Sequence, residues 1–185
     1  MKVVILGLGA DPEWVEKYSS AIGEVWAIND WWSVYPNYIP DRALQLHLNL
    51  PEQPLPKQPW RWNNWVERYR KLGNKVLLSD YDSRFPEAII ANTRELEEVF
   101  GASHFTSSCA CAIMIARFRF NVDEVILAGF TLQGEEFELQ TPGIMRAVTS
   151  VEDSGGVVLW EQRKKIRTVD WTKVNDVQLQ GYWRK

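Results

Sequence analysis

The sequence predicts one α/β domain: a single doubly wound, mostly parallel β-sheet of the Rossmann-like kind, with helices on both faces. Short, unbroken runs of β-branched and aliphatic residues are typical of strands buried on both faces, and they alternate with longer segments of helical spacing. The 185 residues, 45% hydrophobic and 24% charged, are enough for one buried core. We expect residues 1–160 to form this domain and residues 161–185 to form a tail that packs on it or extends from it.

Six segments have the pattern of buried strands. The first is a short apolar run that ends at two glycines one residue apart, Gly7 and Gly9. A strand that turns on glycines into a helix is a frequent setting for the phosphate of a nucleotide. The expected strands cover residues 3–6, 24–29, 42–48, 75–79, 122–130 and 155–160.

The helices are expected between these strands. Asp11 can cap a first helix and Pro12 suits its first position. The aromatic segment 30–40 and the proline-rich segment 51–60 are expected to be irregular, the second as a connector or a lid over a site. Helical spacing predicts further helices over residues 62–72, one or two over 85–101, a central one over 104–120, and one over 135–151, either continuous or broken at Pro142 and Gly143.

The overall charge argues against two classes of partner. At a net charge of −3 the chain has no general attraction for nucleic acid or for an anionic membrane. Its apolar runs are shorter than the roughly 18 to 20 residues that span a bilayer, and its first residues do not read as a signal peptide. We therefore expect a cytoplasmic protein without membrane or nucleic-acid partners, and its self-association into a homo-oligomer stays open.

The cysteines and histidines do not indicate a metal site. Cys109 and Cys111 are two residues apart, so on a helix they lie on different faces and are expected to be buried free thiols. With His47 and His104 as its only histidines, the chain cannot assemble a His/Cys zinc site. We expect no metal and no required cofactor.

Polar residues and glycines follow the expected strands at their carboxyl ends, where ligands bind in open α/β sheets. Each also has a structural interpretation: turn glycines, helix caps, or a half-buried histidine. Asp11 would compete with a phosphate for the amides at the first helix start, so a phosphate would be held by the glycines and the start of the central helix together. The candidate nucleotide-binding residues are Gly7, Gly9, Asn29, Asp30, Asn49, Thr106, Ser107, Ser108 and Gly129, with His47 beside them.

Tryptophan is unusually abundant, with 10 residues in the chain. Trp31 and Trp32 directly follow the second expected strand, and three more occupy positions 60, 62 and 65. Such rings can stack on a substrate, or they can pack in the core. We keep both interpretations for Trp31 and Trp32.

The segment "TSSCACAIMIARFRFNVDEVILAGF" (106–130), with "GLGAD" (7–11) and "AIND" (27–30), resembles the bacterial sialyltransferases that use CMP-sialic acid. The same outline is similar to a group of often bacteriophage-encoded proteins related to the pterin pyrophosphokinase-like family, in which "HFTSS", "AGF", "EFELQTP" and the histidine of "LQLHLNLP" have counterparts. The resemblance spans residues 3 to about 160. It implies a Rossmann-like fold and a nucleotide site lined by Gly7, Gly9, Asn29, Asn49, Thr106 and Ser107.

From these observations we expect a glycosyltransferase-like enzyme that uses a nucleotide-linked donor, for which a CMP-sugar is one candidate. His47 is the candidate general base or phosphate partner, because its ordinary pKa of about 6.5 suits proton transfer near neutrality. Glu136 would act with it in catalysis, Gln140 would bind the transferred group, and Trp31 and Trp32 would stack on the acceptor. The alternative is a non-catalytic protein that binds a nucleotide or signalling molecule, or an interaction protein. The short chain and the absence of any histidine after His104 favour that alternative.

Overall fold

The sheet confirms the predicted fold class. The computed structural model describes residues 1–11, 15, 23–47, 64–130 and 135–160, and for residues 135–139 only the backbone. Seven strands form one sheet in the order β5-β4-β3-β2-β1-β6-β7, and every neighbouring pair is parallel. The strands are β1 (Lys2–Leu6), β2 (Glu24–Ile28), β3 (Arg42–Gln45), β4 (Val76–Leu78), β5 (Ile89–Ile90), β6 (Glu124–Ala128) and β7 (Val157–Trp160).

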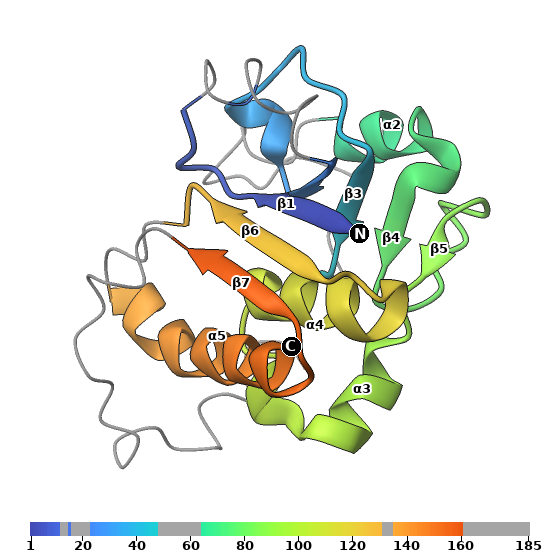
Figure 1. Cartoon of the computed structure of the whole chain (residues 1–185). Helices are drawn as coiled ribbons and strands as arrows, with labels where there is room; N and C mark the ends of the chain where they lie inside the picture. Colours follow the sequence, from blue (N-terminus) through green and yellow to red (C-terminus); the bar gives the residue numbers. More distant parts are fainter. Residues whose placement is uncertain (12–14, 16–22, 48–63, 131–134, 161–185) are drawn as a thin grey trace.

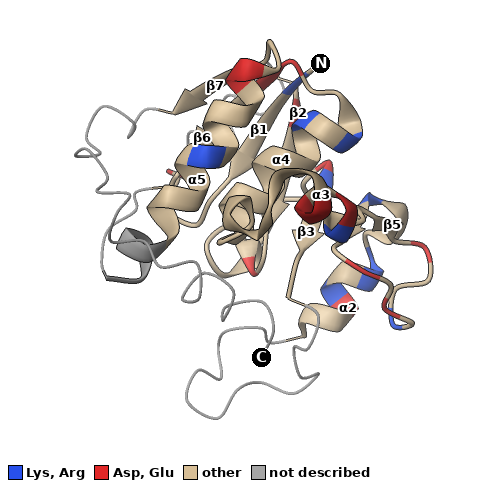
Figure 2. Cartoon of the chain, turned by 90° about the horizontal axis from the view of Figure 1, so that it is seen from below, with Lys and Arg blue, Asp and Glu red and all other residues tan. Residues whose placement is uncertain are grey.

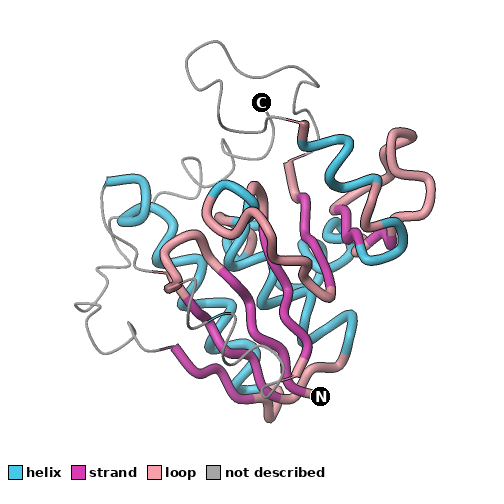
Figure 3. The backbone as a smooth tube through the Cα atoms, turned by 90° about the horizontal axis from the view of Figure 1, so that it is seen from above, coloured by secondary structure: helices cyan, strands magenta, loops and turns pink. Residues whose placement is uncertain are grey.

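The strand order reverses between β1 and β6. From β1 the chain adds strands outward to β5, then returns across the sheet to place β6 on the other side of β1. In open parallel sheets such a reversal leaves a crevice at the carboxyl ends of the two strands, where ligands bind. The view down onto the sheet shows the strands side by side, with helices behind them (Figure 3).

Helices cover both faces of the sheet. In Figure 1, α3, α4 and α5 lie on one face and α2 lies on the other. Short 3-10 helices occur at Trp31–Ser33, Gly73–Lys75 and Ala102–His104. The α-helices are α2 (Trp65–Arg70), α3 (Thr93–Phe100), α4 (Ser108–Phe120) and α5 (Glu135–Asp153).

Each face of the sheet has its own hydrophobic core. Alternate strand residues point to opposite faces, so Val3 and Ile5 face α4 and α5, whereas Val4 and Leu6 face the other side. Residues 109–116 of α4 are all buried, which is typical of a helix enclosed by neighbours on every side. The second core is aromatic and contains Trp31, Trp32, Tyr35, Trp65, Tyr69 and Phe85. Because the central strands are covered by a core on each face, their sequences are continuous apolar runs.

A strand occupies the first part of a segment expected to be helical. Over residues 85–101 the prediction of one or two helices is wrong at Ile89–Ile90, which form β5, and holds from Thr93 onward. Ile89 and Ile90 pair with β4, and the N–H of Ala91 donates to the carbonyl of Leu78 at 2.7 Å. Two residues carry too short a pattern to indicate a strand, so pairing with β4 decides their conformation.

Of the two alternatives for the last helix, continuous or broken at Pro142 and Gly143, the structure has the continuous one. Helix α5 is continuous through Pro142 to Asp153. It packs on α4 and on β7, so tertiary contacts outweigh the weakening that proline causes in a helix. No helix among the described residues is long and apolar enough to cross a membrane. Of the helix expected after Asp11, the structure describes Val15, which is helical and whose N–H donates to the carbonyl of Asp11 at 3.1 Å. The rest of that helix and the 51–60 segment lie outside the described residues.

Candidate functional site

The turns after β1 and β6 bind each other directly at the strand-order reversal. The N–H of Gly7 donates to the carbonyl of Ala128 at 2.8 Å, and the N–H of Gly9 donates to the carbonyl of Gly129 at 3.1 Å. Gly129 has φ +76°, and a Cβ there would lie 2.1 Å from the nitrogen of Ala10. Glycine is required at this position by both conformation and space. The structure thus brings together three of the predicted residues, Gly7, Gly9 and Gly129.

Tyr35 holds the turn after β1 from the aromatic side of the sheet. Its hydroxyl lies 3.0 Å from the carbonyl oxygen of Gly7 and 2.7 Å from that of Ala10. Burial raises the pKa of Tyr35 to about 12, so the phenol keeps its proton and can donate to these carbonyls. Sequence reasoning did not find this residue, because no spacing rule links an aromatic loop to a turn 25 residues earlier.

Asn29 and Ser108 connect the end of β2 to the start of α4. The Nδ2 of Asn29 donates to the Oγ of Ser108 at 3.2 Å, and the Ser108 hydroxyl lies 3.4 Å from Asn29 Oδ1. Asn29 has φ 53°, a left-handed conformation that asparagine adopts more readily than most residues. Both residues were predicted to line one site, and the structure places them in contact across 79 positions of sequence.

Ser107 and Thr106 also have structural partners. The Oγ of Ser107 accepts a hydrogen bond from the N–H of Ala110 at 3.1 Å, so Ser107 is the N-cap of α4. The hydroxyl of Thr106 donates to the carbonyl of Gln140 at 3.3 Å. The 13 residues of α4 leave further N–H groups and a partial positive charge at this end. The start of α4 is therefore held by hydrogen bonds of Thr106 and Ser107, and its partial positive charge favours an anion.

Asp30, Trp31 and Trp32 are buried in the aromatic core. The two indole rings are 4.8 Å apart in an edge-to-face arrangement. Both rings also meet the ring of Tyr69, and Arg68 lies over Trp32 at 5.6 Å. Trp31 is 4% exposed and Trp32 is 6% exposed. Of the two interpretations of these residues, packing in the core is therefore confirmed. Stacking on an acceptor stays a prediction.

Tyr69 is a second residue that the sequence did not reveal. Its hydroxyl lies 2.9 Å from the carbonyl oxygen of Asn29 and 3.1 Å from that of Leu44. Burial, reinforced by the charge of Asp30, raises the pKa of Tyr69 well above its ordinary value. The tyrosine thereby ties α2 to the ends of β2 and β3, and so supports the backbone at Asn29.

His47 lies just beyond the carboxyl end of β3 and is half-buried. Its backbone N–H donates to the Oε1 of Gln45 at 3.0 Å. Gln45 is 2% exposed, and its Nε2 makes no hydrogen bond to the part of the chain that the structure describes. Because β3 neighbours β2, His47 belongs to the same edge of the sheet as Asn29. The prediction that these residues share one edge is consistent with this register.

Two predicted residues cannot be placed in this way. Asn49 lies outside the described residues, and of Glu136 only the backbone, in α5, is described. Gln140 is half-buried in the same helix and takes part through its carbonyl, which accepts the Thr106 hydroxyl. The roles of Asn49, Glu136 and the Gln140 side chain stay predictions.

The cysteines behave as predicted. Cys109 and Cys111 are free and buried in α4, and burial raises the pKa of both thiols. Within the described ranges, no group of three or more His, Cys, Asp or Glu residues could hold a metal ion.

Comparisons with protein-family models, with curated proteins and with solved structures gave no match. The resemblance of the sequence segments to sialyltransferases and to the pterin pyrophosphokinase-like group stays a prediction.

Proposed function

We propose that this protein binds a nucleotide-linked substrate at the carboxyl edge of its sheet and transfers the linked group, as a glycosyltransferase-like enzyme. The hydrogen bond between Asn29 and Ser108 carries the proposal, because it joins the end of β2 to the start of α4. The strand-order reversal between β1 and β6 lies next to β2. Polar groups and a helix start thus lie at the edge where parallel sheets bind nucleotides.

The phosphates would lie between the turn after β1 and the start of α4. The N–H groups of the first turn of α4 and the helix dipole favour a negative charge there. Gly9 is exposed and has no side chain, so a phosphate can approach the backbone closely. Because the amides of Gly7 and Gly9 already donate to β6 and its turn, α4 supplies the hydrogen bonds and the exposed Gly9 supplies space.

The nucleoside would extend along the edge toward β3. Asn29 and Asp30 would contact the base or the ribose, with Asn49 beside them. A buried donor without a partner costs about 1–3 kcal/mol, and an acceptor on the ligand would relieve that cost at Gln45 Nε2. His47, at the end of the same strand, would remove a proton from the acceptor, with Glu136 acting in the same step and Gln140 binding the transferred group.

One observation favours the second candidate, a non-catalytic binder. The amides of Gly7 and Gly9 are already engaged, which leaves fewer donors to stabilise charge that develops on a leaving phosphate. Binding needs only the ground-state contacts, whereas transfer needs contacts that strengthen in the transition state.

A thermal-shift panel tests the proposal. CMP-, UDP- and GDP-sugars, NAD and cyclic nucleotides are added separately to the full chain, and any nucleotide that raises the melting temperature is followed for consumption. A nucleotide-sugar that binds and is consumed supports the transferase, and one that binds unchanged supports the binder. No response to any nucleotide contradicts both.

A pair of matched variants locates the site. Asn29→Asp keeps a residue that tolerates the left-handed conformation and adds a negative charge beside the start of α4. We expect the Kd of the bound nucleotide to rise about tenfold or more, a change of about 1.4 kcal/mol, while the melting temperature without ligand is kept because an acid is favourable at a helix start. Asn121→Asp is the control: Asn121 also has a left-handed φ, 52°, but ends α4 at its opposite end. An equal loss of affinity in both variants would place the ligand elsewhere.

A further inference from the structure

One face of the sheet is uncovered at its last strand, β7. Successive side chains of this strand point to opposite faces: Val158 and Trp160 are buried in the core that contains α4, whereas Val157 is 49% exposed and Leu159 is 48% exposed. Parallel sheets are normally covered on both faces, because their strands are apolar on both sides. The described helices therefore leave part of this sheet without such a cover.

The exposure increases from strand to strand toward β7. Val4 of β1, Ile126 of β6 and Leu159 of β7 are neighbours in the sheet register and point to the same face. Val4 is 1% exposed, and Ile126 is half-buried at the border of the aromatic core. The aromatic core thus ends at β6, and apolar surface continues past it. We call the surface of Ile126, Val157 and Leu159 the β7 patch.

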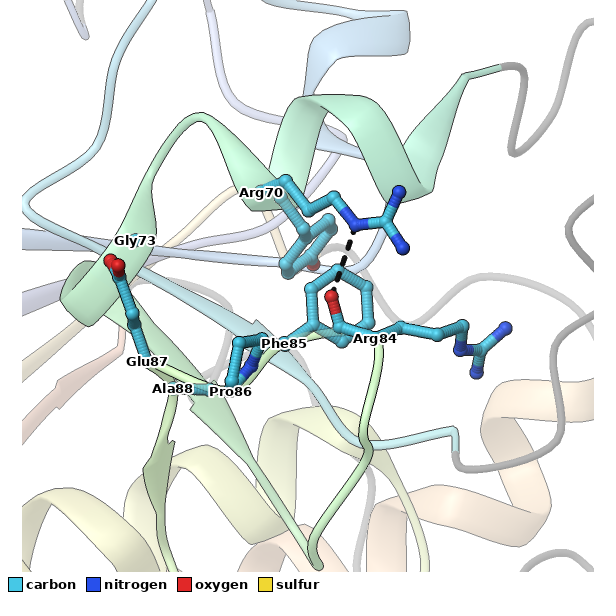
Figure 4. Close-up of a pocket in the computed structure, with 8 residues that line it drawn as sticks. Arg70, Gly73, Arg84, Phe85, Pro86, Glu87 and Ala88 are labelled. Atoms are coloured by element: carbon cyan, nitrogen blue, oxygen red, sulfur yellow. Dashed lines mark hydrogen bonds between the residues drawn. The ribbon is translucent and has the colours of Figure 1, made fainter.

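The opposite edge of the same face is closed. There α2 and the loop before β5 pack over β4, with Tyr69 and Phe85 buried between them. The Nε of Arg70 in α2 donates to the carbonyl of Arg84 in that loop at 3.1 Å, which joins the two segments (Figure 4). In Figure 1, α2 lies near β4, and no described helix of this face lies over β7. The missing cover is thus particular to the β7 side.

The chain that follows β7 has the composition of a covering segment. Eight of the 25 residues 161–185 are aliphatic or aromatic, including Trp171 and Trp183. Tryptophan side chains are large and are mostly buried in proteins, and segments that stay extended in water contain few such residues. The composition of this segment therefore favours packing on the domain.

The segment begins beside the β7 patch and is long enough to cover it. Trp160 ends β7, and its indole Nε1 donates to the carbonyl of Phe130, just after β6, at 3.2 Å. A strand of four residues spans about 13 Å, and 25 residues span about 37 Å even at the short rise of a helix. A chain that turns back after Trp160 can therefore cross the whole patch.

Charge favours this segment over a second copy of the protein as the cover. Residues 161–185 hold seven Lys and Arg against three Asp and Glu, whereas residues 1–160 hold 14 against 21. Figure 2 shows acidic residues where α5 ends beside β7, and these are Glu152 and Asp153. Two acidic domains repel each other, whereas a basic segment is attracted. Attachment to the same chain adds a high effective concentration.

We propose that residues 161–185 pack on the β7 patch and complete the second face of the sheet. Apolar side chains of the segment cover Val157 and Leu159 and extend the contact to Ile126. Basic side chains of the segment lie toward the acidic end of α5. This docking is independent of the proposed transferase activity.

Limited trypsin digestion of the full chain tests the docking, because residues 163–173 contain five Lys and Arg at which trypsin cleaves. Leu159→Ser should raise the rate of cleavage in this range about tenfold, a change of about 1.4 kcal/mol, because it removes an apolar contact that holds the segment. Cleavage after Arg117, in α4, reports unfolding of the whole domain and should stay unchanged.

Ile90→Ser is the matched control, since Ile90 is an exposed aliphatic residue of β5, the strand at the opposite edge of the sheet. It should leave cleavage of residues 163–173 as slow as in the unaltered protein. Equal cleavage of this range in the unaltered protein and in Leu159→Ser would overturn the proposal. Circular dichroism checks that each variant is folded.

A crosslink identifies what covers the patch. Val157→Cys is labelled with a benzophenone maleimide, which spares Cys109 and Cys111 because both are buried and burial raises the pKa of their thiols. Illumination should link this position to residues 161–185 of the same chain. Val99→Cys, at an exposed position of α3 on the other face, should give no such link. A link between two chains, or none to residues 161–185, would overturn the proposal.

Discussion

The hydroxyl oxygen of Thr106 occupies the space into which a side chain at Gly143 would extend. A Cβ at Gly143 would lie only 1.8 Å from Thr106 Oγ1, and 2.8 Å from its Cβ. This close approach lets the Thr106 hydroxyl reach the carbonyl of Gln140 at 3.3 Å. Helix α5 is thereby held beside the start of α4, at one end of the proposed site.

Gly143→Ala is expected to destabilise the fold. Replacing glycine by alanine in a helix gains up to about 1 kcal/mol, but overpacking against a buried side chain costs about 1–3 kcal/mol. The clash should prevail, because Thr106 is 3% exposed and has little room to move. Urea unfolding measures the difference. Thr149→Ala, an exposed change in the same helix, should stay within about 0.5 kcal/mol of the unaltered protein. Gly143→Ala that is as stable as this control would contradict the contact.

Ser107→Ala should remove the cap of α4. The Ser107 Oγ satisfies the N–H of Ala110, and losing such a cap costs about 0.5–2 kcal/mol. Ser33→Ala, at an exposed position of a 3-10 helix, is the matched change and should alter the free energy of unfolding little. Equal stability of the two variants in urea would show that α4 does not depend on this cap.

Stability should fall at alkaline pH. Folding raises the pKa of Tyr35 to about 12 and raises those of Tyr69, Cys109 and Cys111, in each case mainly through burial. The protonated forms are favoured in the folded state, so their contribution is complete below the unfolded pKa values, about 8.5 for a thiol and 10 for a phenol. It is lost as pH rises through the folded values. Each group contributes a slope of at most about 1.4 kcal/mol per pH unit.

Replacing one phenol tests this pH dependence. Tyr35→Phe should reduce the slope of the free energy of unfolding above about pH 10, because one titrating group is removed. At neutral pH it should cost about 1 kcal/mol for the lost hydrogen bond to the turn after β1. Tyr81→Phe is the control, since Tyr81 is 68% exposed. Identical slopes for both variants would mean that Tyr35 does not titrate as described.

His47→Ala should abolish turnover of the nucleotide-sugar that binds, with little loss of stability. The half-buried side chain at the sheet edge is the proposed base, and its removal leaves the packed core intact. His104→Ala is the matched change. His104 lies beside the ring of Phe100 at 6.0 Å, so this variant should lose some stability but keep turnover. Full activity of His47→Ala, measured as donor consumption, would remove His47 from the mechanism.

Local sequence patterns predicted the elements that depend on neighbours in sequence. Val3 to Leu6 are buried in β1, and Ser107 caps α4 at the position where the run of hydroxyl residues placed a helix start. These features follow from side-chain burial and from hydrogen bonds across a few residues, which a sequence displays directly. Strand β5 does not follow from such local patterns, because Ile89 and Ile90 are extended only through their pairing with β4.

The candidate site was predicted as a set of strand-end residues, but its contacts were not. The sequence by itself determined a wound parallel sheet and the polar or glycine residues that end its strands, because burial on both faces leaves continuous apolar runs. Only the tertiary structure decided that Asn29 binds Ser108 and that Tyr35 and Tyr69 hold the neighbouring backbone. Those contacts join residues far apart in the chain, so their free energy exists only once the sheet has formed.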